Sequence, residues 1–460
     1  MNLTVDNIST LSINDLLGEN IGCECGRSHN CNVKNMIIEN GAINKIPKLL
    51  KKLNFNNILM VADTNTYKVA GKKVEDILNK NKVNFRKFIY NTKEGELLVP
   101  DEKAIGTLFT KFEKGMDAIL TVGSGVLNDL SKFVSYRLGV DCIIVATAPS
   151  MDGFISDGSS LIVDDLKSTF VSQPPKAVIG DIDILKKAPM DMILAGFGDI
   201  IGKYSALCDW KLSKIVNNEY YCEVVVKMVK DSLDKCVGSI DGIKNREDEA
   251  IKNLMESLLL TGIAMSYIGN SRPASGAEHH MSHYFELMFL FEGRKALFHG
   301  TKVGISTVLI TKMRELIKEE KLDFDKAIKN ISSFDENEWE EKIRELYGKA
   351  APEIIALSKK DETNSTQKRL KRVNNIKEKF NQVMKSMDET PSSETIKSIL
   401  KKVGAPYMPS QVGIQDDMVF NSVLVAKEVR TRYTILQLLG DFGILDKFAH
   451  KIVDYLKEEK

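Results

Sequence analysis

The sequence lacks the features that mark membrane, exported and nucleic-acid-binding proteins. No apolar stretch among its 460 residues approaches the roughly 18 residues that a membrane span requires. The first residues carry no basic segment followed by an apolar one, so we expect no signal peptide and a cytoplasmic protein. Lysine and arginine number 64 and aspartate and glutamate 63, and this balance gives no support for nucleic-acid binding or membrane insertion.

Cysteine is scarce, and its number is odd. The seven cysteines of a long chain without an export signal are expected to be reduced thiols and not a disulfide framework. Four soft ligands, Cys23, Cys25, His29 and Cys31, lie within nine residues. A structural zinc is one interpretation, but the C-x-C spacing is tighter than usual and no second half-site is evident. We therefore expect an unmetallated turn that leads into the first strand.

The first part of the chain has the texture of an α/β domain. Short apolar runs at 57–62, 118–122 and 142–146 end at turn residues, as strands buried in a parallel sheet do. Between the first two runs, residues 101–114 carry apolar side chains at helical spacing. Alternation of strand and helix predicts a Rossmann-like dinucleotide-binding domain over residues 1–185.

Proline becomes rare in the second part of the chain. Only Pro273 and Pro352 occur between residues 190 and 390, where long amphipathic segments such as 218–236 and 247–267 predict helices. We therefore expect an all-helical domain over residues 186–460. Its stretch at about 312–400 is highly charged with both signs mixed, which indicates a solvated helical insertion and not a nucleic-acid surface.

A glycine turn follows the second apolar run. Gly123 and Gly125 stand between that run and a helical stripe, where backbone N–H groups suit a phosphate or pyrophosphate. The pattern is neither G-x-G-x-x-G nor a Walker loop, so a purely structural turn is an equal alternative. Asp63, at the end of the first run, is a candidate ribose ligand that would favour NADH over NADPH, with a helix cap as the alternative.

Histidine is rare but clustered. Ser275 and Glu278 have the spacing of a capping box, which predicts that a helix begins there. Two histidines of that helix, four residues apart, share one face, as metal ligands in helical bundles do. With a third imidazole or a carboxylate they would leave the open position that a catalytic metal needs. Four of the six histidines fall within 21 residues: His279, His280, His283 and His299.

Asp199 is the best carboxylate candidate for this metal. It follows a glycine pair and begins an apolar segment, although aspartate also serves well as a helix N-cap and spacing alone does not select Asp199 over several other acids. Lys203 and Arg272 flank the two histidine- and aspartate-bearing segments. They are candidate ligands for the substrate phosphate that the family resemblance described next implies, with surface pairing as the alternative.

Five segments together resemble the sn-glycerol-1-phosphate dehydrogenase family, within the dehydroquinate-synthase-like and iron-containing alcohol dehydrogenase group. They occur in family order and span most of the chain, and they look most like the bacterial branch with its longer C-terminal helical region. The segments are GSGVLND at 123–129, TAPSMDGF at 147–154, GFGD at 196–199, SRPASGAEH at 271–279 and RTRYT at 430–434.

The resemblance implies an N-terminal NAD(P)-binding domain and a helical domain that holds one divalent metal, for which zinc, nickel and iron(II) are all suitable. By family match the metal ligands would be Asp199, His279 and His299, and Asp152 and His283 would contact substrate. A homodimer is expected by the same analogy. The residues expected at the dinucleotide are Gly125, Val126, Leu127, Asn128, Asp129, Thr147, Ala148, Pro149, Ser150 and Ser156.

The implied reaction is reversible reduction of dihydroxyacetone phosphate to sn-glycerol 1-phosphate, a step of phospholipid metabolism. Asp199 and His283 are the predicted catalytic residues, and His283 is expected to take part in proton transfer. The nearest alternative is a glycerol dehydrogenase that acts on an unphosphorylated polyol. A dehydroquinate-synthase-type lyase and a non-catalytic metal or nucleotide sensor are further alternatives.

Overall fold

The computed structural model describes residues 2–93, 98–164 and 166–459. The chain forms two compact units, one of residues up to Ile200 with Glu223–Asn270, the other of Ile201–Cys222 with the residues from Ser271 onward. The predicted domain boundary at residue 185 lies where the alternation of strands and helices ends and only helices follow. The compact units divide later, inside helix α7 (Met190–Asn217).

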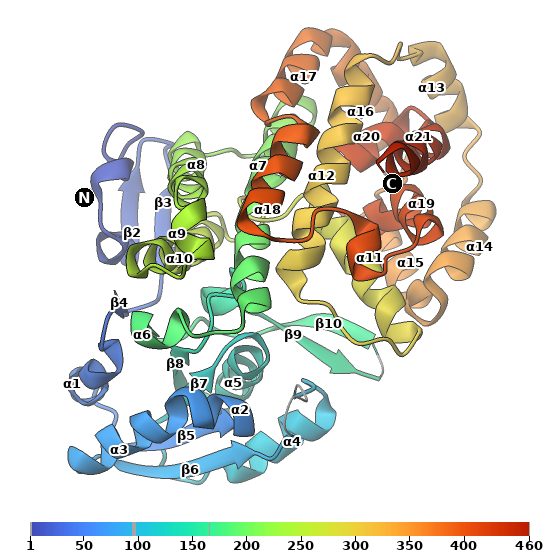
Figure 1. Cartoon of the computed structure of the whole chain (residues 1–460). Coiled ribbons are helices and arrows are strands. Elements are labelled where there is room, and N and C mark those ends of the chain that lie inside the picture. The colour runs from blue at the N-terminus through green and yellow to red at the C-terminus, as the bar shows by residue number, and fades with distance from the viewer. Residues whose placement is uncertain (1, 94–97, 165, 460) are drawn as a thin grey trace. The chain divides into compact units, whose positions relative to one another are not determined.

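A parallel sheet of six strands forms the centre of the first unit (Figure 1). The three apolar runs are its strands β5, β7 and β8, so the predicted α/β class is confirmed. In sheet order the strands are β4 (Asn35–Glu39), β11 (Ala177–Asp181), β8 (Asp141–Ala146), β7 (Ala118–Gly123), β5 (Asn57–Asp63) and β6 (Asn84–Tyr90).

Helices cover both faces of this sheet. Ile58 and Met60 of β5 point into a core shared with α1 and α3, whereas Leu59 and Val61 point into a core shared with α4 and α5. Since successive side chains of a strand alternate between faces, one apolar run supplies both cores. The helices are α1 (Ile46–Lys52), α3 (Lys72–Lys80), α4 (Glu102–Lys111) and α5 (Gly125–Leu138).

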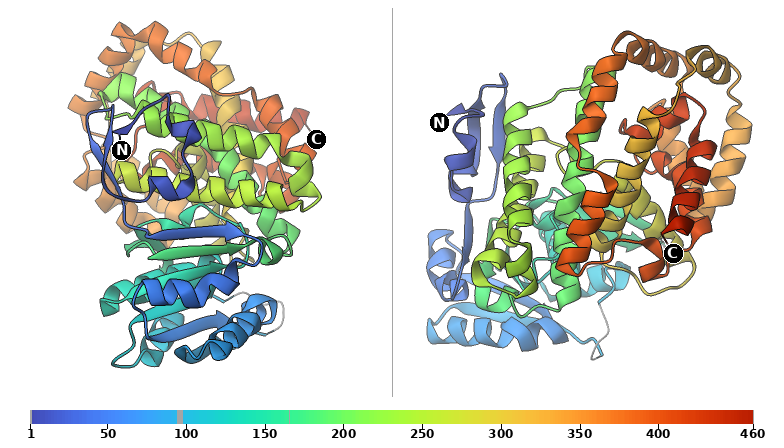
Figure 2. Two further views of the ribbon diagram at one scale, coloured as in Figure 1. Left: turned by 90° about the vertical axis from the view of Figure 1, so that its left-hand side faces the viewer. Right: turned by 45° about the horizontal axis from the view of Figure 1, so that its top comes forward.

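A small N-terminal sheet completes the first unit. Strands β1 (Asn2–Leu3), β2 (Gly18–Cys23) and β3 (Ser28–Cys31) lie beside α8 (Glu223–Gly238) and α10 (Asp248–Ile268) in both views of Figure 2. The Tyr267 hydroxyl of α10 donates to the carbonyl oxygen of Leu16 at 2.6 Å. The helices predicted at 218–236 and 247–267 are α8 and α10. Helix α8 begins only at Glu223, after Asn218, which has a positive φ of 55°.

The second unit is helical. Its helix α12 (His299–Lys318) packs on α11 (Ala277–Phe291), α18 (Ser393–Val403) and α21 (Leu445–Glu458). Arg314 of α12 forms a fully buried ion pair with Asp209 of α7 at 2.9 Å. No helix of the described residues is both long and apolar enough to cross a membrane. The charged insertion predicted at about 312–400 consists of helices. These helices are α13 (Phe324–Ser332), α14 (Glu336–Tyr347), α15 (Ala351–Lys360), α16 (Thr366–Glu378) and α17 (Phe380–Ser386).

Candidate active site

The glycine turn joins the end of β7 to the start of α5. A Cβ at Gly123 would lie 2.5 Å from Cδ1 of Leu127, so a larger residue would displace that side chain. The Thr147 N–H donates to the Gly123 carbonyl at 3.2 Å, and the Ser124 and Ser150 hydroxyl oxygens are 2.7 Å apart. The two loops predicted to contact the dinucleotide therefore lie side by side at the carboxyl ends of β7 and β8.

Polar side chains after the turn hold its neighbouring loop. The buried Lys132 ammonium donates to the Gly153 carbonyl at 2.9 Å and to the Ser156 hydroxyl at 2.8 Å. A carboxylate oxygen of Asp129 accepts the N–H of Ser160 at 3.1 Å. Ser156 and Asp129 thus have structural partners, and their predicted contact with a dinucleotide stays a prediction.

Asp63 lies at the switch point of the sheet. From β5 the chain crosses to β6 on one side and then returns to β7 on the other, and ligands of such sheets bind where the strand order reverses. Asp63 ends β5 next to the end of β7. Its carboxylate accepts the Thr66 N–H at 2.7 Å, so the helix cap that we weighed against ribose binding is present.

The start of α7 packs tightly against the Thr147–Ser150 loop. A Cβ at Gly196 would lie only 1.9 Å from the carbonyl oxygen of Pro149, so no other residue fits there without backbone movement. One turn later the fully buried Asp199 accepts the N–H of Asp152 at 3.0 Å. Asp199 is in the helix interior, and its carboxylate is not the N-cap that was the alternative prediction.

The predicted capping box at the start of α11 is wrong in detail. Gly276, not Ser275, is the N-cap residue, and it has no side chain to cap with. Glu278 still reaches back and accepts the Gly276 N–H at 2.7 Å, while the Ala277 N–H donates to Asp209 at 2.8 Å. The carboxylate of Asp209, which is distant in sequence, therefore accepts an N–H of the first turn of α11, the capping role that the sequence suggested for Ser275.

Three of the clustered histidines converge. The ring centroids of His279 and His299 are 5.1 Å apart, those of His283 and His299 are 5.6 Å apart, and those of His279 and His283 are 6.4 Å apart. His279 Nδ1 donates to a Glu278 carboxylate oxygen at 2.7 Å, which leaves Nε2 as its ligand nitrogen. Burial opposes ionisation of Glu278, but this hydrogen bond lowers its pKa overall.

The ligand atoms of Asp199, His279 and His299 all lie within 4.8 Å of one another. One carboxylate and two imidazoles suit zinc, nickel and iron(II), and three protein ligands leave a position open. Asp199 and His279 are buried, and a buried carboxylate is stabilised by a nearby cation. The chemistry of these residues therefore fits a catalytic divalent metal.

Glu286 was not predicted to belong to this region. Its carboxylate lies 3.7 Å from Nδ1 of His283 and 2.9 Å from the buried ammonium of Lys302. With His283 and His299 it forms a second, overlapping group of possible metal ligands. Burial lowers the pKa of His283 to about 4, although Glu286 opposes this effect. The i, i+3 spacing of His283 and Glu286 was the sequence signal.

The two basic phosphate candidates have protein partners. Arg272 donates to both carboxylate oxygens of Glu219, at 2.8 and 2.6 Å, and to the Tyr433 carbonyl at 2.8 Å. Lys203 is fully buried and donates to the carbonyl oxygen of Ala274 at 3.2 Å. The structure thus gives both residues a structural role, and their predicted contact with substrate is not tested.

Two further arginines, Arg430 and Arg432, lie near His280, whose pKa is lowered by burial and then by their charges. Burial, and then the like charges of Arg272 and Arg430, lower the pKa of Arg432 to about 9. Among the described residues the buried Nη1 of Arg432 has no hydrogen-bond partner, and neither ring nitrogen of His280 has one. Both arginines lie in the RTRYT segment that carried the family resemblance, which was the available signal.

Comparison with known proteins defines the class. Residues 37–189 match the model of the iron-containing alcohol dehydrogenase family. The structure is similar to that of glycerol dehydrogenase from Schizosaccharomyces pombe, with a TM-score of 0.56 and 14% identity over 91% of this chain and 90% of that one. It is also similar to the NADH-dependent butanol dehydrogenase A from Thermotoga maritima, with a TM-score of 0.56 and 14% identity, over 92% and 98% of the two chains. The fold is thus that of the iron-containing alcohol dehydrogenases.

Sequence relatives identify the family within this class. The glycerol-1-phosphate dehydrogenase [NAD(P)+] of Halalkalibacterium halodurans is 33% identical over 91% of this chain and 95% of its own length. That of Pyrococcus horikoshii is 32% identical, but over 60% of this chain and 77% of its own. The chain therefore belongs to the glycerol-1-phosphate dehydrogenase family of NAD(P)-linked oxidoreductases. The predicted family and its bacterial-type branch are confirmed.

Proposed function

We propose that this protein is an sn-glycerol-1-phosphate dehydrogenase that reversibly reduces dihydroxyacetone phosphate with NAD(P)H and a divalent cation. Two relatives named glycerol-1-phosphate dehydrogenase [NAD(P)+] align with this chain over 95% and 100% of their own length. NADH is the proposed preference, because a carboxylate such as Asp63 at the ribose would repel a 2′-phosphate. The overall reaction consumes one hydride from the nicotinamide and one proton.

We assign the cation to Asp199, His279 and His299, whose ligand atoms lie close together. When bound, such a cation stabilises negative charge on the substrate oxygen as a Lewis acid, and the dinucleotide supplies the hydride. The alternative group of His283, Glu286 and His299 is less suited. Its carboxylate already has the Lys302 ammonium as a counter-charge, at 2.9 Å.

His283 is the proposed proton-transfer residue. Nδ1 of its ring faces Glu286, so Nε2 is the atom that would exchange a proton with the substrate oxygen or with a water. Asp152 is proposed to orient the substrate hydroxyl. Its backbone N–H donates to the proposed metal ligand Asp199, which places Asp152 beside the metal site.

The arginine group is the observation that favours a phosphorylated substrate. Glu219 compensates Arg272. Among the described residues, however, the buried Nη1 of Arg432 has no hydrogen-bond partner, and the like charges of Arg272 and Arg430 affect Arg432 more than the carboxylates of Glu219 and Glu278 do. A guanidinium stays charged in proteins, and its fork matches phosphate oxygens. An unphosphorylated polyol would offer no anion to these arginines, so a glycerol dehydrogenase is the weaker alternative.

Comparison of dihydroxyacetone phosphate with dihydroxyacetone in NADH oxidation tests the proposal. We expect kcat/KM to favour the phosphate ester by at least about a hundredfold, because a site built for an anion rejects the analogue that lacks it. Arg432→Met should reduce the ratio of kcat/KM for the two ketones. The matched control is Arg294→Met, because Arg294 donates to the Gly413 carbonyl. Equal kcat/KM for both ketones would assign a polyol dehydrogenase, and absence of net NADH consumption would point to a lyase.

The site of action and the assembly are also proposals. The seven cysteines, all in the described part of the chain, form no disulfide, which suits the reducing cytoplasm. The homodimer expected from the family resemblance is tested by light scattering of the purified protein.

A further inference from the structure

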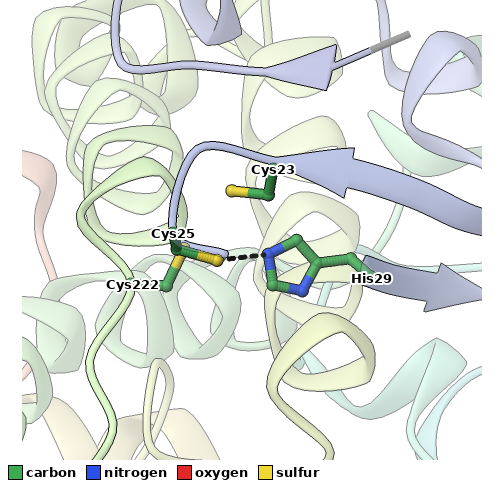
Figure 3. Close-up of side chains that lie close together, drawn as sticks. All are labelled: Cys23, Cys25, His29 and Cys222. Carbon is green, nitrogen blue, oxygen red and sulfur yellow. Dashed lines mark hydrogen bonds between the residues drawn. The ribbon is translucent and has the colours of Figure 1, made fainter. Parts of the chain in front are cut away.

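Outside the dehydrogenase site, three thiols and an imidazole lie together. Figure 3 shows Cys23 at the end of β2, Cys25 in the turn that follows, His29 on β3 and Cys222 just before α8. Their ligand atoms all lie within 4.8 Å of one another. Cys31, which the sequence grouped with the first three, is not a member of this set, and Cys222 takes its place.

The orientation of His29 is fixed by its surroundings. Nδ1 lies 3.0 Å from the backbone carbonyl oxygen of Tyr267, and the ring stacks on the Tyr267 ring at 4.8 Å and 8°. Because a carbonyl oxygen only accepts, Nδ1 carries the hydrogen and Nε2 keeps its lone pair. A carbonyl partner of this kind is typical of histidines that bind metal through the other nitrogen.

The lone pair of His29 faces sulfur. Nε2 lies 3.6 Å from Sγ of Cys25. In a tetrahedral zinc site, with Zn–S of about 2.3 Å and Zn–N of about 2.0–2.1 Å, sulfur and nitrogen are about 3.5 Å apart. The observed separation therefore equals the edge of such a tetrahedron, without any movement of the two side chains.

Burial suits a site closed to solvent. Cys23, His29 and Cys222 are buried, with exposures of 7%, 1% and 0%, and Cys25 is intermediate. Three thiolates and one imidazole form a complete ligand set for structural zinc, with no position left for water or substrate. The second half-site, whose absence spoke against zinc in the sequence, is Cys222.

We propose that Cys23, Cys25, His29 and Cys222 hold a structural zinc ion, separate from the catalytic metal. The ion would fasten the turn between β2 and β3 to the residue that precedes α8. Since such a site does not exist in the unfolded chain, its binding free energy would stabilise the folded protein. It is a structural element and takes no part in hydride transfer.

X-ray absorption of the zinc-loaded full-length protein tests this site directly. Asp199, His279 and His299 offer no sulfur, so a shell of sulfur at about 2.3 Å reports on the cysteine site alone. We expect that shell together with one additional equivalent of tightly held zinc per chain. Zinc bound only by nitrogen and oxygen would overturn the proposal, and neither readout depends on turnover.

Variants provide the second arm. Cys222→Ser should lose one equivalent of zinc and the sulfur shell, whereas Cys31→Ser, a buried cysteine two residues from His29, should keep both. Undiminished sulfur-bound zinc in Cys222→Ser would contradict the assignment. If Cys222→Ser does not fold, titration of the wild-type thiols with a mercurial reagent replaces it: one zinc should be released as three thiols react, and no release would overturn the proposal.

Discussion

Nδ1 of His279 lies 2.7 Å from a carboxylate oxygen of Glu278, its neighbour in sequence, and both side chains are almost completely buried. Adjacent residues on a helix normally point in different directions, and here the carboxylate turns back across the first turn of α11. The same oxygen accepts the Gly276 N–H at 2.7 Å. One buried carboxylate thus caps the helix and orients a proposed metal ligand.

The Glu278–His279 hydrogen bond should be important for metal affinity. Glu278→Gln preserves the volume and an accepting oxygen but removes the charge that makes the imidazole a stronger ligand. We expect metal affinity to fall about 10- to 100-fold, measured by competition with a chelator. Glu292→Gln, an exposed glutamate next to the end of α11, is the control. Equal affinity in both variants would show that Glu278 only caps the helix.

Loss of His283 and loss of His279 should differ in kind. His283→Ala should retain the metal while kcat falls about 10²- to 10⁴-fold, because a proton-transfer group is removed. His279→Ala should lose metal and turnover together. Metal content by mass spectrometry, measured beside kcat, separates the two. Loss of metal in His283→Ala at an unchanged rate per bound metal would favour the ligand set that includes Glu286.

Gly196 should be essential for the loop that precedes Asp152. A Cβ there would meet the Pro149 carbonyl oxygen at 1.9 Å, so Gly196→Ala should displace the loop, raise KM for NADH and lower stability by about 1–3 kcal/mol. Gly106→Ala, in the exposed part of α4 with nothing within 4 Å, should instead stabilise by about 0.5–1 kcal/mol. Unchanged cofactor KM and thermal stability in Gly196→Ala would mean that the loop has more room than the structure indicates.

Docking of the C-terminal helix should depend on pH. Glu320, 13% exposed, binds Lys447 and Lys451 of α21 at 2.5 and 3.1 Å, and the hydrogen bond from Lys447 lowers its pKa despite partial burial. Because its pKa is lower in the folded state, the carboxylate stabilises above its unfolded pKa of about 4.3 and this contribution is lost as pH falls below that value.

Glu320→Gln should therefore lower the free energy of unfolding by about 0.5–1 kcal/mol at pH 7, with a smaller difference at pH 3. Urea denaturation at both pH values measures it, with the exposed Glu319→Gln as the control. A deficit that is equal at both pH values would indicate lost packing and not lost charge.

Local patterns predicted the sheet well. The runs in β5, β7 and β8 are apolar because both faces of each strand are buried, and that signal lies within a few residues. The N-terminal sheet was not predicted. We expected a turn before the first strand at residues 23–31, but these residues end β2, turn and form β3, whose polar residues such as His29 and Asn30 gave no apolar signal in the sequence.

The sites depend on longer-range relationships that local patterns do not contain. Clustering pointed to His279, His283 and His299, but family resemblance was needed to choose Asp199. Cys222 could not be related to Cys23 and Cys25 from spacing, because only the tertiary fold brings it near them. Arg432 lies in the RTRYT segment of the family resemblance, but only the structure distinguishes it, because its buried Nη1 has no hydrogen-bond partner among the described residues.

Metal removal and reconstitution test the central claim most directly. Protein stripped with a chelator and reloaded with zinc, nickel or iron(II) one at a time is assayed for dihydroxyacetone phosphate-dependent NADH oxidation. We expect no oxidation in the stripped protein, recovery with at least one ion, and no recovery in Asp199→Ala. A full rate in the stripped protein, or recovery in Asp199→Ala equal to that of the unaltered chain, would contradict the proposed metal site.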